Sequence, residues 1–90
     1  MTLVEVAHGL EAAEVERRLR ALAERHEIAL RVSAPGQAGE LQKQVPFLGS
    51  GEARYGIRSD ALAGEVTRAP GILAVRLSAL LESEVTRALA

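Results

Sequence analysis

The predicted fold rests on one stretch of sequence, Arg68-Ala69-Pro70-Gly71-Ile72-Leu73-Ala74-Val75-Arg76-Leu77. A Pro-Gly pair is a strong turn signal, and here it separates two segments of different character. Before the pair, Ser59 is a good helix N-cap, and the apolar residues after it recur at helical spacing. After the pair, residues 72–77 form a short apolar run that is typical of a strand. The stretch therefore predicts a helix over residues 59–69, a turn, and a strand over residues 72–77.

Outward from this stretch, the clearest element is an amphipathic helix near the start of the chain. Residues 10–27 carry Val15, Leu19 and Leu22 on one face, with acidic residues early and arginines late. That order of charge complements the helix dipole. The spacing therefore predicts a helix over residues 10–27.

Three further strands and a terminal helix are predicted from period-two alternation and from apolar spacing. The expected strands cover residues 3–7, 28–33 and 53–58, and the expected terminal helix covers residues 78–90. Residues 34–52 are rich in proline and glycine, and we expect a long loop or a short edge hairpin there. Within that segment, residues 39–44 could make a helical turn and residues 45–48 a short edge strand, where proline is tolerated.

The expected element order is strand, helix, strand, strand, helix, strand and a terminal helix, within a single α+β domain of residues 1–90. Two interleaved βαβ units of this kind predict a ferredoxin-like βαββαβ sandwich with an extra C-terminal helix. The stretch around Pro70-Gly71 resembles the helix end, turn and strand of small regulatory domains such as ACT domains, and of metal-chaperone domains. That resemblance implies a fold and no site, because the metal-chaperone pattern needs a pair of cysteines and this chain has none.

The composition restricts the classes of function. The formal net charge is −1, so no overall field favours nucleic acid or an anionic membrane. The chain has no cysteine, which excludes disulfides and thiolate metal sites and fits a cytoplasmic location. No basic region precedes an apolar stretch at the start, and no apolar run is long enough to span a bilayer, so we expect neither a signal peptide nor a membrane partner. Every cation except Lys43 is arginine, which fits either a GC-rich genome or ion-pair networks selected at high temperature.

The predicted sheet pattern brings four arginines to one face. If the apolar alternate positions of each strand face the helices, the positions between them face away. These outward positions include Arg31, Arg54, Arg58 and Arg76, against the acidic residue Glu5. The sequence therefore predicts a locally cationic, partly apolar open face on a nearly neutral protein.

Three interpretations of this face stay open. In the first, a symmetry mate or the terminal helix packs on it, because half-open sheets in small domains commonly bury apolar positions by association. In the second, the four arginines bind a small anionic ligand. In the third, the face binds RNA, which we do not favour because RNA-binding sheets stack bases on aromatic rings. Both rings of this chain, Phe47 and Tyr55, are expected elsewhere.

The remaining candidates are better explained by structure than by chemistry. The polar segment 35–44 holds Lys43 and is a candidate ligand lid, or simply a connection. His8 and His26 are a helix length apart, so a shared metal site is not expected. Ser50, between two glycines, fits a hairpin turn better than the nucleophile elbow of hydrolases.

Together these observations predict a small non-enzymatic regulatory or protein-interaction module that self-associates as a homodimer. An anionic-ligand-binding domain is the alternative, and an RNA-binding accessory protein is a further alternative. We expect no catalytic residue, no metal and no cofactor.

Overall fold

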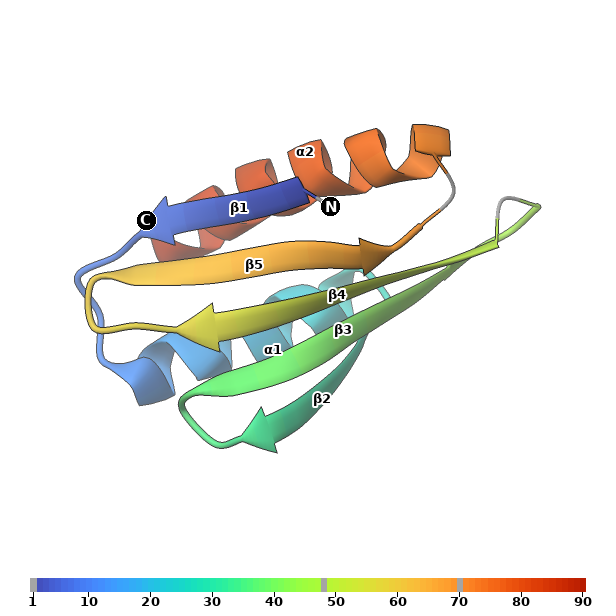
Figure 1. The fold of residues 1–90 in the computed structure, drawn as a ribbon. Coiled ribbons are helices and arrows are strands. Elements are labelled where there is room, and N and C mark those ends of the chain that lie inside the picture. The colour runs from blue at the N-terminus through green and yellow to red at the C-terminus, as the bar shows by residue number, and fades with distance from the viewer. Residues whose placement is uncertain (1, 48, 70) are drawn as a thin grey trace.

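The computed structural model describes residues 2–47, 49–69 and 71–90. Within these residues the protein is α+β, and two helices lie on one face of a five-stranded antiparallel sheet (Figure 1). The elements are β1 (Thr2–Ala7), α1 (Ala12–Arg25), β2 (Ala29–Ala34), β3 (Ala38–Val45), β4 (Gly49–Ile57), β5 (Ala61–Arg68) and α2 (Gly71–Leu89). The strand order is β1-β5-β4-β3-β2. Helix α1 therefore carries the chain from one edge of the sheet to the other, and β2 to β5 return as a meander.

The ferredoxin-like βαββαβ order is wrong, because the segment expected as the second helix is strand β5. Leu62 and Val66 are four residues apart, which fits one face of a helix and equally fits one face of a strand. In the structure both are buried, and Gly64 stands between them on the same face of β5. A strand is stable here because β5 pairs with β1 on one side and with β4 on the other.

The strand expected over residues 72–77 is also wrong, because this segment is the first part of α2. One continuous helix, Gly71–Leu89, joins it to the expected terminal helix. The side chain of Leu77 occupies the place where a β-carbon on Gly51 would stand, so a glycine in β4 lets α2 approach the sheet closely. Pro70, in the predicted turn, lies outside the described residues.

The early elements are confirmed with small shifts, while the segment 34–52 is mostly strand. The strands expected over residues 3–7, 28–33 and 53–58 correspond to β1, β2 and part of β4, and the first helix is α1. The long loop and the helical turn are wrong, because residues 38–45 form β3 between two other strands. A β3–β4 hairpin is present, with Phe47 at its tip at a φ of 68° and fully exposed. The edge strand expected over residues 45–48 is also wrong, because Val45 ends β3, which lies between β2 and β4, and Leu48 lies outside the described residues.

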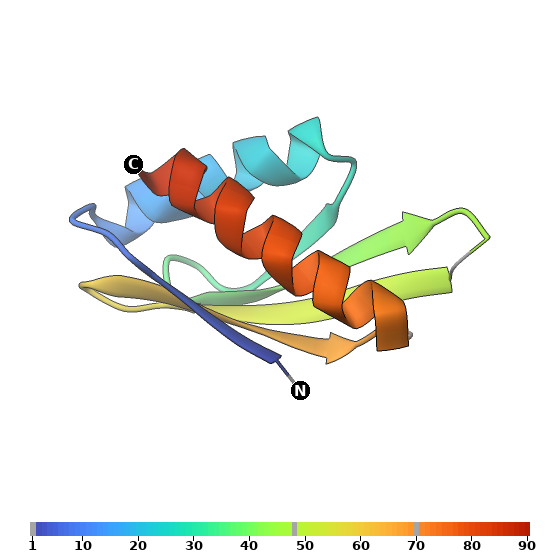
Figure 2. The same cartoon turned by 90° about the horizontal axis from the view of Figure 1, so that it is seen from above.

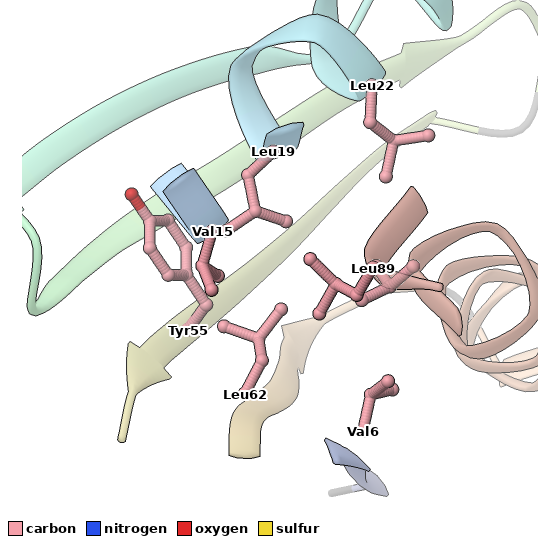
Figure 3. Close-up of a cluster of buried hydrophobic side chains, with 8 residues drawn as sticks. Val6, Val15, Leu19, Leu22, Tyr55, Leu62 and Leu89 are labelled. Carbon is pink, nitrogen blue, oxygen red and sulfur yellow. The ribbon is translucent and has the colours of Figure 1, made fainter. Parts of the chain in front are cut away.

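The core lies between the two helices and the sheet. Eight buried side chains form one cluster, most of which Figure 3 labels: Val6, Val15, Leu19, Leu22, Tyr55, Leu62, Val85 and Leu89. Figure 2 shows both helices above the same face of the sheet. Helix α2 lies mainly over β1 and beside α1, whereas α1 lies over β2 and β4. The other face of the sheet is consequently not covered by either helix.

Polar contacts hold α1 in place within this layer. Arg18 donates a hydrogen bond to the carbonyl oxygen of Ala88, near the end of α2, at 3.0 Å. Arg17 and Arg18 also donate to the carboxylate of Glu14, and these hydrogen bonds lower the pKa of Glu14 to about 2. The arginine that bonds the last turn of α2 is thus fixed by a carboxylate on its own helix.

Candidate functional site

The candidate site is the open face, which we define as the surface of the sheet opposite α1 and α2 (Figure 2). Alternation along the strands decides which side chains point there. On β4, Tyr55 is buried in the core and its neighbour Arg54 is exposed. On β1, Val4 packs against the core and Leu3 is 77% exposed. On β2 and β3 the outward positions include Arg31 and Glu40, which are exposed.

The strand register places charges of alternating sign in one row across the open face. Arg31 of β2 is opposite Glu40 of β3, Glu40 is opposite Arg54 of β4, and Arg54 is opposite Glu65 of β5. Leu3 of β1 follows, opposite Glu65. Side chains that are directly opposite on antiparallel strands have β-carbons about 5 Å apart, so each charge lies next to charges of the other sign. We call the four charged residues, Arg31, Glu40, Arg54 and Glu65, the charge row.

Two shallow hollows lie on the open face, one on each side of Arg54. The first has a volume of about 220 Å³, and its lining includes Arg31, Arg54, Glu40 and Glu52. The second, of about 210 Å³, is lined by Leu3, Arg54 and Glu65 together with small residues of β4 and β5. Because arginines and glutamates line the first hollow together, its charge is close to balanced.

The four arginines predicted as one site are only partly brought together. Arg31 and Arg54 both line the first hollow. Arg58 follows the end of β4 and forms an ion pair with Glu5. Arg76 lies on α2, so its assignment to the sheet is wrong. The physical reason is that α2 replaces the expected fourth strand.

Sequence reasoning missed the acidic half of the open face. Glu40 lies in a segment that the sequence predicted as a loop, and Glu65 lies in a segment predicted as a helix. With both segments folded as strands, these glutamates stand next to Arg54 on either side. The open face is therefore mixed in charge and not cationic. In the sequence, the position of the apolar residue Leu41 between the polar residues Glu40 and Gln42 is the alternation that indicates strand β3.

The other sequence candidates have structural roles. Lys43 lies on β3, and its ammonium group donates a hydrogen bond to the carbonyl oxygen of His26, just after α1. The Nε2 atom of His26 is 3.4 Å from a carboxylate oxygen of Glu84 on α2. The Nδ1 atom of His8 accepts a hydrogen bond from the backbone N–H of Leu10 at 3.2 Å. Ser50 lies in the β3–β4 ladder opposite Gln44, away from any strand-to-helix turn.

Comparison with known proteins does not add a family. No protein-family model matches the chain, and no curated protein matches its sequence. Across the described ranges, neither helix has the length and apolar character needed to cross a membrane. No cluster of three or more potential metal ligands occurs among the described residues.

Proposed function

We propose that this chain is a small non-enzymatic interaction module that self-associates through its open face. The observation that carries the proposal is the position of the two helices, both on the opposite face of the sheet (Figure 2). Most soluble oligomers are symmetric homo-oligomers, in which the same surface of each copy forms the contact, and the open face is the sheet surface that neither helix covers. The absence of cysteine fits the reducing cytoplasm, where we place this module.

The charge balance of the open face supports self-association over binding of an acidic partner. A uniformly cationic face would repel a second copy, whereas a face with adjacent arginines and glutamates does not. Small side chains such as Ala29, Ala38 and Ala63 surround the charge row and allow close approach. At a strand spacing of about 4.8 Å and a rise of about 3.3 Å per residue, the five strands form a face of about 20 by 20 Å. This area is smaller than the roughly 800 Å² that each partner buries in a standard interface, so we expect a weak, reversible dimer.

Size-exclusion chromatography with light scattering, from low to high micromolar concentration, tests the proposal. The wild-type chain is expected to shift from monomer towards dimer as concentration rises. Ala63→Arg places a long charged side chain on the open face and is expected to keep the chain monomeric. The matched control is Ala13→Arg on the exposed side of α1, which should dimerise like the wild type.

Two results would contradict the proposal. A wild-type chain that stays monomeric at high micromolar concentration would exclude self-association. A dimer that survives Ala63→Arg would show that the copies associate elsewhere, for example along the free edge of β2.

A small anionic ligand is the second candidate, because Arg31 and Arg54 line the same hollow of about 220 Å³. Thermal-shift screening against nucleotides, amino acids and phosphorylated metabolites tests it. A stabilising ligand should lose its effect in Arg31→Ala and Arg54→Ala variants. RNA binding lacks comparable support, because Tyr55 is buried on the helix side and Phe47 lies at the hairpin tip.

A further inference from the structure

We propose that two copies pair face to face about a two-fold axis that runs parallel to the strands, between β3 and β4. The charge row of one copy then lies over the same row of the second copy in reverse order. This inference rests on the proposed function, since it specifies the symmetry and register of self-association through the open face. The second copy of this chain is the partner.

The geometry of a face-to-face pair limits the possible axes. When two identical sheets pack on each other, the two-fold axis must lie in the plane between them, because it exchanges the two sheets. An axis parallel to the strands reverses the strand order and keeps each residue at its own height along the strands. With the axis between β3 and β4, strand β3 lies over β4 of the second copy, and β2 lies over β5 of the second copy.

This axis pairs every member of the charge row with a charge of the opposite sign. Arg31 faces Glu65 of the second copy, and Glu40 faces Arg54 of the second copy. Symmetry then repeats both pairs in the other direction, which gives four complementary pairs. When a row of alternating charges has an even number of members, reversing its order places each charge opposite one of the other sign. The charge row has four members of alternating sign, so it meets this condition.

Other axes give like charges or leave half of the row unpaired. An axis perpendicular to the strands that runs along the row would place each member of the row over its own copy. An axis parallel to the strands but along β4 would place Arg54 over Arg54 and Glu40 over Glu65. Axes between β2 and β3, or between β4 and β5, would form two complementary pairs only. Juxtaposed like charges are costly at an interface, so the row selects one register from these alternatives.

The two inner pairs, each formed by Glu40 of one copy and Arg54 of the other, test the register best. Packed sheets cross at about 30° because each sheet is twisted, so residues far from the axis are displaced more than residues near it. Glu40 and Arg54 lie on the strands that flank the axis. The hollows on either side of Arg54, of about 220 and 210 Å³, leave space for long side chains from the second copy.

Charge reversal of the inner pair tests the register. Glu40→Arg alone would face Arg54 of the second copy, and Arg54→Glu alone would face Glu40 of the second copy. Each single variant is expected to have a dimer Kd at least about tenfold above that of the wild type. An equimolar mixture of the two variants restores all four complementary pairs, so it should form a heterodimer with a Kd within about threefold of the wild-type value. Native mass spectrometry distinguishes the heterodimer from both homodimers.

Controls separate this effect from damage to the fold. Circular dichroism and urea unfolding should show that each variant is folded, because a reversed charge also disturbs its neighbours within one chain. Glu24→Arg on the exposed side of α1 changes the charge equally and should leave the Kd unchanged. The double variant with both Glu40→Arg and Arg54→Glu has a row that is again self-complementary, so it should dimerise with itself.

The outcomes distinguish this inference from the proposed function. If Ala63→Arg abolishes the dimer but the mixture of charge variants forms no heterodimer, the register is wrong and association through the open face stands. The register is also wrong if both single variants dimerise like the wild type. If the wild-type chain never dimerises, both proposals fail. Preferential heterodimer formation supports both.

Discussion

Gly39 and Tyr55 lie directly opposite each other on β3 and β4, and the position of the tyrosine ring explains why residue 39 is a glycine. The Tyr55 ring covers Gly39, so that a β-carbon on the glycine would overlap the ring and its hydroxyl group. Burial is also the main cause that raises the pKa of the Tyr55 hydroxyl. Within the described part of the chain this buried hydroxyl group has no hydrogen-bond partner. The pair is therefore held by packing of the ring on the backbone.

Replacing Gly39 by alanine should destabilise the protein through this contact. We expect the free energy of unfolding to fall by about 1–3 kcal/mol in Gly39→Ala, because the ring must move out of a packed position. Urea denaturation measures the change. In a Tyr55→Leu background the added methyl group meets no ring, and the same substitution should be neutral or slightly stabilising. An equal loss in both backgrounds would contradict the proposed role of the ring.

At the scale of residues, sequence alternation predicted the inward positions better than the charged partners. The apolar alternate positions of each strand were expected to face the helices, and those of β1, β2 and β4 that pack in or against the core include Val4, Val6, Leu30 and Ile57. Alternation within one strand needs only local information. The opposition of Glu40 to Arg54 depends on which strands are neighbours and in what register, and no segment of the sequence carries that information alone.

At the scale of elements, two of the segments given the wrong type of secondary structure lie on either side of Pro70-Gly71, and the third is the segment 34–52. The alternation of β5 is weakened by Gly64, which has no side chain on the inward face, so helical spacing was the stronger local signal. The first part of α2 is rich in aliphatic residues, which predicted a strand. Tertiary context overrides such local preferences, because β5 completes two ladders and α2 covers the core.

A substitution at Val75 distinguishes a helix from a strand in this segment. Val75 is 71% exposed, so its side chain contributes little buried surface. In a helix, Val75→Ala should raise the free energy of unfolding by up to about 0.6 kcal/mol, because alanine has the higher helix propensity. Val75→Pro should lower it by up to about 3 kcal/mol. Thermal and urea denaturation measure both changes.

The opposite sign for alanine would contradict the helix. If residues 72–77 formed a strand, Val75→Ala would remove a β-branched residue and cost up to about 1 kcal/mol. Backbone chemical shifts of residues 75–80 provide an independent readout of helical conformation.

At the scale of the whole molecule, the α+β class was predicted and the topology was not. The correct class follows from one clear helix and several alternating segments, which local sequence shows. The order of the strands depends on pairing between distant segments, above all of β1 with β5. The three segments assigned to the wrong type, residues 34–52, 59–69 and 72–77, together changed the predicted topology.

The proposed dimer should respond to salt in a way that identifies its charge pairs. Raising sodium chloride from about 50 to 500 mM shortens the screening length, so the dimer Kd should rise about threefold or more. Sedimentation equilibrium measures this change. The double variant with Glu40→Gln and Arg54→Gln removes the inner pairs and should show a smaller salt effect. Association that strengthens with salt would indicate an apolar interface instead.

The return of β1 to the edge beside β5 has a consequence for how the chain reaches its native state. Strands β2 to β5 pair with their sequence neighbours, whereas β1 pairs with residues that are 54 to 64 positions away. Contacts across so long a segment form only after a large loss of chain entropy. We therefore expect the meander of β2 to β5 to form before β1 docks, so that the edge of β5 is exposed for a time during folding.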